Sequence, residues 1–346
     1  MMKQRSNEYW DRRAMERMAE YHRGADRTMR TLSAAYDAAL ANIQAEIDKI
    51  FNRYSRDGRM SPKEARQLLN TPLTPQERSE LTEQMRKVRD PTIRQQMLNR
   101  LNSAAYRARI TRLQALRENI HLQTKLLADI EVKITEKWYV DVIDEAFYRT
   151  MFDIQRGLGL GFRFDPMPQK VVQEILRNPW SGKHFSRRVW ANTEELAKLL
   201  EERLTAGFMS GTPRRKLALE LEERMNVGKH AANRLVRTET TYMANSAEME
   251  SYEEAEVDEY QFLATLDSRT SEICRKHDLK VYAVKEAKAG VNMPPLHPYC
   301  RSTTRAYFGL ETLEGIQRRA TDPETGRSVL VPASMSYEDW KQKYGT

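Results

Sequence analysis

Residues 113–134 read LQALRENIHLQTKLLADIEVKI, and this stretch decides the fold of a chain of 346 residues. Its apolar residues recur at spacings of three, four and seven, which is typical of a helix with one buried side. They are Leu113, Leu116, Ile120, Leu127, Ile130 and Ile134. Neither Gly nor Pro occurs between 92 and 156, so one long helix is predicted over that range.

Helical signals continue on both sides of this stretch. Residues 8–54 contain one Gly and no Pro, which predicts a long helix, with a break at Gly24 as an alternative. Ser61-Pro62-Lys63-Glu64 and Thr74-Pro75-Gln76-Glu77 match the capping box, so a short helix is predicted to begin at each. Further helices are predicted over 168–177, 193–206, 213–225 and 229–255.

The C-terminal part has a different character. Residues 259–266, 280–284 and 302–308 are rich in β-branched and aromatic residues and are separated by turns, which predicts a small antiparallel sheet. The fold class is therefore mostly α, with long N-terminal helices and a small C-terminal α+β domain that carries a short antiparallel sheet.

Glycines at alternate positions between 157 and 161 and the prolines up to 168 mark a linker. A phosphate-binding loop is the alternative there, but the following Lys-Ser/Thr is lacking. We therefore expect an elongated helical domain over 1–160, an α+β domain over 168–308 whose first part is helical to about 228, and an arm over 309–346.

The charge is uneven along the chain. Of 57 basic and 49 acidic residues, nearly all the excess of +8 lies in the N-terminal half, and the segment 86–125 is the most basic part. This segment predicts either a solvated helix face or a contact with nucleic acid or with an acidic protein. The candidate contacts are Arg94, Arg100, Arg107, Arg109, Arg112 and Arg117. No apolar stretch is long enough to span a membrane, and the first residues lack a secretion signal, so we expect synthesis and first action in a cytosol.

Both cysteines of the chain belong to one candidate metal site. Cys274 and His277, then His297 and Cys300, form two pairs with two intervening residues each, set on either side of a predicted hairpin. Such spacing matches the way proteins hold tetrahedral Zn²⁺, and four protein ligands would make the ion structural. The alternatives are two buried free thiols with a hydrogen-bonded histidine, or a cysteine pair oxidised outside the cell.

Polar residues gather near this site. Thr238 and Asn245 interrupt an apolar helix stripe, and Arg237 and Glu239 flank it. We expect them to hydrogen-bond to the sheet or its loops, as a structural network that locks helix to loop. Asp267-Ser268-Arg269-Thr270 follows a strand and predicts a side-chain-bonded turn. No nucleophile with an obvious base is found, which favours structure over catalysis.

Together these residues resemble a known family. Their order and spacing over about 200–308 are similar to the C-terminal domain of the minor head proteins of tailed bacteriophages, the head-morphogenesis family related to the F protein of phage Mu. The resemblance is carried by Arg237-Thr238-Glu239-Thr240, Asn245, Thr265 to Thr270, Cys274, Asp278 to Tyr282, and Pro294 to Ser302.

The resemblance implies a virion component of few copies, associated with the portal vertex, without an established enzymatic activity. The family's cysteine and histidine positions fall on Cys274, His297 and Cys300, and Asp267, Arg269 and Arg301 join the network. Ser271 stands where many relatives have a further cysteine, which leaves the fourth ligand position to His277. Leu279 stands where many have Gly, which suggests a turn without a left-handed Gly.

The leading hypothesis is a minor structural protein of a phage head that acts in head assembly or in DNA packaging or ejection. Its expected partners are the portal protein, the major capsid protein or packaged DNA, with no membrane and no small-molecule substrate. Its expected location is the virion head, after the host cytoplasm. One alternative is an enzyme, such as a metal-dependent nuclease or another phage-encoded effector, although the 38 residues after 308 are too few for an appended catalytic domain. Another is a DNA-binding assembly chaperone that leaves the particle.

Overall fold

The computed structural model describes residues 7–54, 60–86, 88, 90–102, 110–158, 161–308, 317–321, 327–332, 335 and 337–344. These residues form two compact units, each assembled from separated segments. Unit 1 contains residues 1–28, 135–185 and 234–346, and unit 2 contains 29–134 and 186–233. Within the described residues, no helix combines the length and apolarity that crossing a membrane requires.

Helices make up most of the chain, as predicted. Long helices are α1 (Asn7–Tyr54), α6 (Arg112–Leu158), α8 (Phe185–Met209) and α9 (Arg214–Glu254). Short ones are α2 (Pro62–Leu69), α3 (Pro75–Arg86), α4 (Pro91–Asn102), α7 (Gln169–Arg177), α10 (Glu272–His277) and α11 (Tyr337–Tyr344). Because α1, α6 and α9 each pass through both units, the units do not coincide with sequential segments of the chain.

Both predicted capping boxes are present at the starts of α2 and α3. The Ser61 side chain accepts from the Glu64 amide, and the Glu64 carboxylate accepts from the Ser61 amide. Thr74 and Glu77 exchange the same pair of hydrogen bonds. Each box satisfies two backbone donors that a helix start would otherwise leave unpaired.

The long helix predicted over 92–156 is instead two helices, α4 and α6. A third reciprocal cap begins α6: the Thr111 hydroxyl accepts from the Gln114 amide at 3.3 Å, and the Gln114 side chain accepts from the Thr111 amide at 2.8 Å. The apolar periodicity of the sequence hid this cap, which lies just before the stripe that begins at Leu113. Elsewhere the chain is more continuous than predicted, since α1 passes Gly24 and α9 passes Gly228 without a break.

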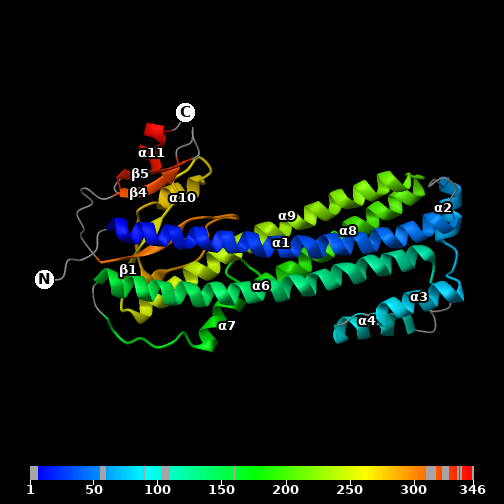
Figure 1. Cartoon of the computed structure of the whole chain (residues 1–346), viewed down its shortest axis with the longest axis horizontal. Coiled ribbons are helices and arrows are strands. Elements are labelled where there is room, and N and C mark those ends of the chain that lie inside the picture. Colours follow the sequence, from blue (N-terminus) through cyan, green and yellow to red (C-terminus); the bar gives the residue numbers. More distant parts are fainter. Residues whose placement is uncertain are drawn as a thin grey trace. The chain divides into compact units, whose positions relative to one another are not determined.

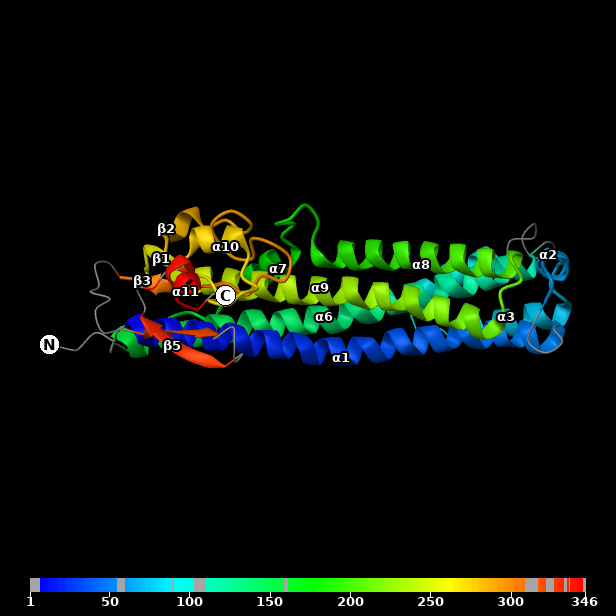
Figure 2. The ribbon, with the colours of Figure 1, turned by 90° about the horizontal axis from the view of Figure 1, so that it is seen from above.

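Unit 1 holds a three-stranded antiparallel sheet in the order β2-β1-β3, which confirms the predicted sheet. The strands are β1 (Glu259–Leu263), β2 (Val281–Ala283) and β3 (Thr303–Tyr307). The first part of α1, the last part of α6 and the last part of α9 run side by side in this unit, as Figures 1 and 2 show.

The described part of the predicted C-terminal arm is folded onto unit 1. Strands β4 (Gln317–Thr321) and β5 (Ser328–Pro332) form an antiparallel hairpin, and Leu266 makes a parallel bridge to Ala320. Trp340 of α11 is buried in a cluster with Leu266, Ala320 and Val331. A buried tryptophan supplies the large apolar area that docks such a segment.

Within the described residues of unit 2 the regular elements are helices, and Pro72 and Thr111 form an isolated bridge. One apolar cluster joins α3, α4 and α6 through Leu81, Met85, Met97 and Leu122, among others. One-sided apolar stripes of this kind are sufficient to explain why these helices pack together.

Candidate functional site

The structure brings three of the predicted metal ligands together. Cys274 lies on α10, and His297 and Cys300 lie on the segment that leads into β3. Their candidate ligand atoms all lie within 4.8 Å of one another, and the two sulfur atoms are 3.6 Å apart. Both cysteines are fully buried and His297 is partly buried. The sulfurs are too far apart for a disulfide, so the thiols are free.

The donor set and its spacing fit a zinc ion. Two thiolates bound tetrahedrally at about 2.3 Å would place their sulfurs about 3.8 Å apart, close to the observed separation. The hydrogen bond between the thiols raises the pKa of Cys274, and burial adds to this. The same bond lowers the pKa of Cys300, and His297 lowers it further. In turn the contact with Cys300 raises the pKa of His297. Thiolate is the form of cysteine that binds zinc.

His277 does not join this cluster, in contrast to the prediction. Its Nδ1 lies 2.7 Å from the hydroxyl of Tyr282, and its ring lies beside Phe262. Ser271, where the resemblance leads us to expect a further cysteine, instead caps α10 by accepting from the Cys274 amide at 3.4 Å. Three protein ligands would leave the fourth position of a tetrahedral ion to water or another ligand.

The predicted polar network surrounds the metal ligands on the side of α9. The Thr238 hydroxyl accepts from the amide of Tyr299, a residue in the left-handed backbone region at φ 60. Asn245 is buried and donates to the carbonyl of Thr241, whose hydroxyl donates to the Cys300 carbonyl at 2.7 Å. Thr241 therefore directly positions the loop that carries His297 and Cys300 (the cysteine loop). The sequence pattern missed Thr241 because it lies outside the apolar stripe.

A second part of the network holds the loop after β1. Arg301 forms a bidentate ion pair with Asp267, and the Arg269 amide donates to the same carboxylate at 2.9 Å. Burial alone would raise the pKa of Asp267, but the hydrogen bond and charge of Arg301, together with the contacts of Arg269, outweigh it and lower the pKa. The Arg269 side chain is exposed, so this residue acts mainly through its backbone.

The two residues that flank the α9 stripe have other partners. Arg237 forms an ion pair with Asp26 of α1. Glu239 is buried and accepts from the indole nitrogen of Trp180 at 3.0 Å. These contacts bind α9 to α1 and to the chain after α7, and they do not involve the cysteine loop.

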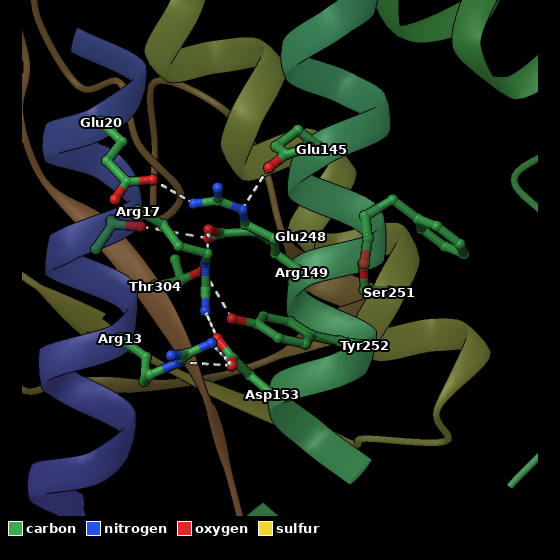
Figure 3. A network of polar contacts seen from close by, with 12 residues as sticks. Arg13, Arg17, Glu20, Glu145, Arg149, Asp153, Glu248, Ser251, Tyr252 and Thr304 are labelled. Carbon is green, nitrogen blue, oxygen red and sulfur yellow. Dashed lines mark hydrogen bonds and ion pairs between the residues drawn. The ribbon is translucent and has the colours of Figure 1, made fainter. Parts of the chain in front are cut away.

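A buried charge network, which the sequence did not indicate, joins α1, α6, α9 and β3. Arg17 lies between the carboxylates of Asp153 and Glu248, and Glu248 also accepts from Thr303 and Thr304, as Figure 3 shows in part. All of these residues are buried. Burial raises the pKa of Glu248, and Arg17 opposes that shift. The four elements are far apart in sequence, so no local motif could reveal the network.

Three of the six candidate polyanion contacts are engaged within unit 2. Arg112 pairs with Glu77 at 2.8 Å, Arg117 pairs with Glu201 at 2.9 Å, and Arg94 donates to the Val88 carbonyl. Arg100 belongs to α4, and Arg107 and Arg109 lie outside the described residues. Burial alone would raise the pKa of Glu77, but hydrogen bonds from Arg112 and Thr74 lower it to about 2.

Comparison with known proteins places the site in a family. Residues 198–305 match the family described as Phage Mu protein F like, which confirms the predicted resemblance to the phage head-morphogenesis family over that segment. This segment contains every metal ligand and every network residue predicted above. A Mu F-like domain indicates a phage head-morphogenesis protein and association with a virion.

One curated relative extends beyond that segment. The chain is 21% identical over 254 residues to the NAD(+)--arginine ADP-ribosyltransferase EFV of Enterococcus faecalis. The match covers 69% of this chain, which spans about half the length of that relative. No solved structure matches the chain.

Proposed function

We propose that this protein is a minor structural protein of a tailed-phage head, associated with the portal vertex and acting in head assembly or in DNA packaging or ejection. The observation that carries the proposal is the match of residues 198–305 to the Phage Mu protein F like family. The protein would act in the host cytoplasm during assembly and remain in the virion head. Its partners would be the portal protein, the major capsid protein or packaged DNA.

The geometry of unit 1 supports a structural role. The cysteine loop, β1, β3 and α9 are fixed to one another by buried polar contacts such as those of Thr241, Asp267 and Glu248. A zinc ion at Cys274, His297 and Cys300 would tie α10 to the segment before β3. We propose that the ion serves structure, because its two sulfur ligands are buried and the described residues around it make a hydrogen-bonded frame.

The test of this function is the composition of purified particles. We expect the protein in mature heads, at few copies, and co-purifying with the portal protein after mild disruption. A full-length Cys274→Ser/Cys300→Ser variant should reduce incorporation, whereas the exposed-face variant Glu222→Gln should be incorporated normally. Absence of the unaltered protein from mature particles would favour an assembly chaperone and contradict the proposal.

A second candidate, ADP-ribosyl transfer, is suggested by the name of the relative from Enterococcus faecalis. We propose that this chain lacks that activity. Incubation of the full-length protein with labelled NAD⁺ and an arginine-rich acceptor should transfer no label. Transfer that rises with protein concentration would show that the chain is an enzyme and would overturn the structural proposal.

A further inference from the structure

A cavity of about 480 Å³ lies in unit 1 away from the metal ligands. Its lining comes from the end of α7 and the residues after it, from α9, and from residues 284–293, which include a short 3₁₀ helix (Val284–Glu286). Pockets that hold small ligands or peptide side chains fall in this range of volume. Neither the metal site nor the buried charge network accounts for this cavity.

Part of the lining is aromatic and rigid. The rings of Trp180 and Tyr242 are stacked, with centroids 5.3 Å apart and planes inclined by 13°. The bond from the Trp180 indole nitrogen to buried Glu239 fixes the orientation of that ring. Met249 and Met293, both buried, add a polarizable apolar surface. This surface is therefore formed before any ligand binds, which lowers the entropic cost of binding.

Near α9 the side chains that line the cavity carry more negative than positive charge. Glu250 and Glu253 of α9 and Glu174 of α7 all line the cavity. Glu174 pairs with Lys170 at 3.6 Å, but among the described residues no ion pair is formed by Glu250 or Glu253. Burial raises the pKa of Glu250, and the charges of Glu253 and Glu174 raise it further. A cation placed here would relieve this repulsion.

The remaining charges make the cavity bipolar. Lys285 and Lys288, from the 3₁₀ helix and the residues after it, line it together with the carboxylates. A polycation such as a polyamine would meet both lysines, and a nucleic-acid phosphate would meet three carboxylates. A peptide satisfies both parts, because a basic side chain can reach the carboxylates while backbone carbonyls or an acidic side chain face the lysines.

We propose that this cavity binds an extended segment of a partner protein, with an apolar side chain on Trp180 and Tyr242 and a lysine or arginine at Glu250 and Glu253. Tyr242 and Glu250 are eight residues apart on α9, which corresponds to about 12 Å along the helix. An extended peptide rises about 3.3 Å per residue, so the apolar and basic residues of the ligand should be about four positions apart. The proposal stands on the cavity and does not depend on the role in the virion.

The test uses the full-length protein and a defined peptide probe. The probe is a fluorescein-labelled octapeptide of alanine and serine with leucine at position 2 and arginine at position 6, and the matched control peptide has glutamate in place of the arginine. Binding is measured by fluorescence anisotropy. The protein variants are Glu250→Gln/Glu253→Gln and, as a control on the exposed face of the same helix, Glu222→Gln/Glu223→Gln. Circular dichroism checks that each variant is folded.

We expect saturable binding of the arginine peptide, at least tenfold weaker binding of the glutamate peptide, and at least a tenfold loss in the Glu250→Gln/Glu253→Gln variant. The control variant should bind like the unaltered protein. No saturable binding, equal binding of the two peptides, or an unchanged affinity in the cavity variant would each overturn the proposal. Displacement of the arginine peptide by micromolar spermidine would also overturn it, because the cavity would then be a site for free polyamines.

Discussion

The two halves of α9 show how differently one helix can be buried. In unit 2, residues 214–233 bury a single stripe that includes Leu217, Leu221, Met225 and Ala232, and the opposite face is exposed. In unit 1, every residue from 238 to 245 is buried, including four polar ones in a row. The first half combines this apolar stripe with polar contacts at its surface, such as the ion pair between Lys229 and Asp37, whereas the second half buries polar groups that require hydrogen-bond partners.

This difference in burial determines where substitutions reduce the stability of the protein most. A one-sided helix tolerates changes on most of its surface, because solvent replaces the lost contacts. A helix buried on all sides does not, because any removed partner leaves an unpaired polar or charged group behind. The half that is fully buried is also the half that contacts the cysteine loop and the sheet.

The largest effect is expected from Arg17→Leu. This change leaves the buried carboxylate of Glu248 without a cation and leaves Asp153 with Arg13 alone, and breaking a buried pair in this way costs about 3–5 kcal/mol. Urea denaturation at neutral pH measures the loss. A loss below about 1 kcal/mol would mean that the second half of α9 tolerates the change as an exposed helix would. It would therefore contradict the contrast between the two halves of α9.

The next effect depends on pH and on His22, which lies 3.4 Å from the Thr241 hydroxyl. Burial, followed by the charge of Arg237, lowers the pKa of His22 from 6.5 to about 4. Between these two pKa values the unfolded chain therefore binds a proton at His22 that the folded chain does not bind. This contribution to stability is complete above pH 6.5 and is lost as pH falls toward 4, by about 3 kcal/mol.

Comparing His22→Gln with the unaltered protein isolates this effect. The free energy of unfolding is measured for both at pH 7 and pH 4, and the other acidic groups cancel in the difference. We expect the variant to lose about 3 kcal/mol less than the unaltered protein over this range. Parallel pH profiles for the two proteins would show that His22 is not held neutral.

Zinc is expected to bind at the cysteine loop, which the second half of α9 contacts. We expect one zinc per chain by elemental mass spectrometry, and a gain of about 2.7 kcal/mol in stability at a free zinc concentration one hundred times the dissociation constant. Cys300→Ser should abolish the stoichiometric ion, and His277→Ala should retain it. Loss of the ion in the His277 variant would instead restore the four-ligand site.

A smaller gain is expected at Leu279, in the turn between α10 and β2. Leu279 has a left-handed φ of 62, a conformation in which a side chain carries a steric cost that glycine avoids. Leu279→Gly should therefore raise the free energy of unfolding by about 1 kcal/mol. The same measurement on Leu266→Gly, at a buried position outside this turn, should show a loss. A loss in both variants would mean that packing of the Leu279 side chain stabilises the protein by more than its left-handed backbone conformation destabilises it.

The smallest effect is expected on the exposed face of the first half of α9. Glu222 is exposed, and Glu222→Gln should change stability by less than about 0.5 kcal/mol. Thermal denaturation of the two proteins side by side is sufficient. A larger change would show that this face is covered, and the contrast between the two halves would disappear.

The same contrast explains what the sequence could predict. The stripe of α6, of which Ile130 proves exposed, the capping boxes of α2 and α3 and the three strands all leave local signals, and they were found. Cys274, His297 and Cys300 were found because their spacing is a local signal as well. Arg17, Glu248 and Thr241 were missed because their partners are distant in sequence, and burial of a charge cannot be inferred from its neighbours. His277 was misplaced because the spacing gave no direction for its side chain.

Gly24 in α1 has a consequence for how related chains vary. A Cβ atom at this position would lie 1.9 Å from a ring atom of Trp138, so the edge of the indole lies against the helix backbone. Glycine in a helix interior is unfavourable by about 1 kcal/mol relative to alanine, and here it is retained for the ring. The two positions therefore constrain each other's evolution: homologues that replace the tryptophan are free to gain alanine at 24, and homologues that keep it are not.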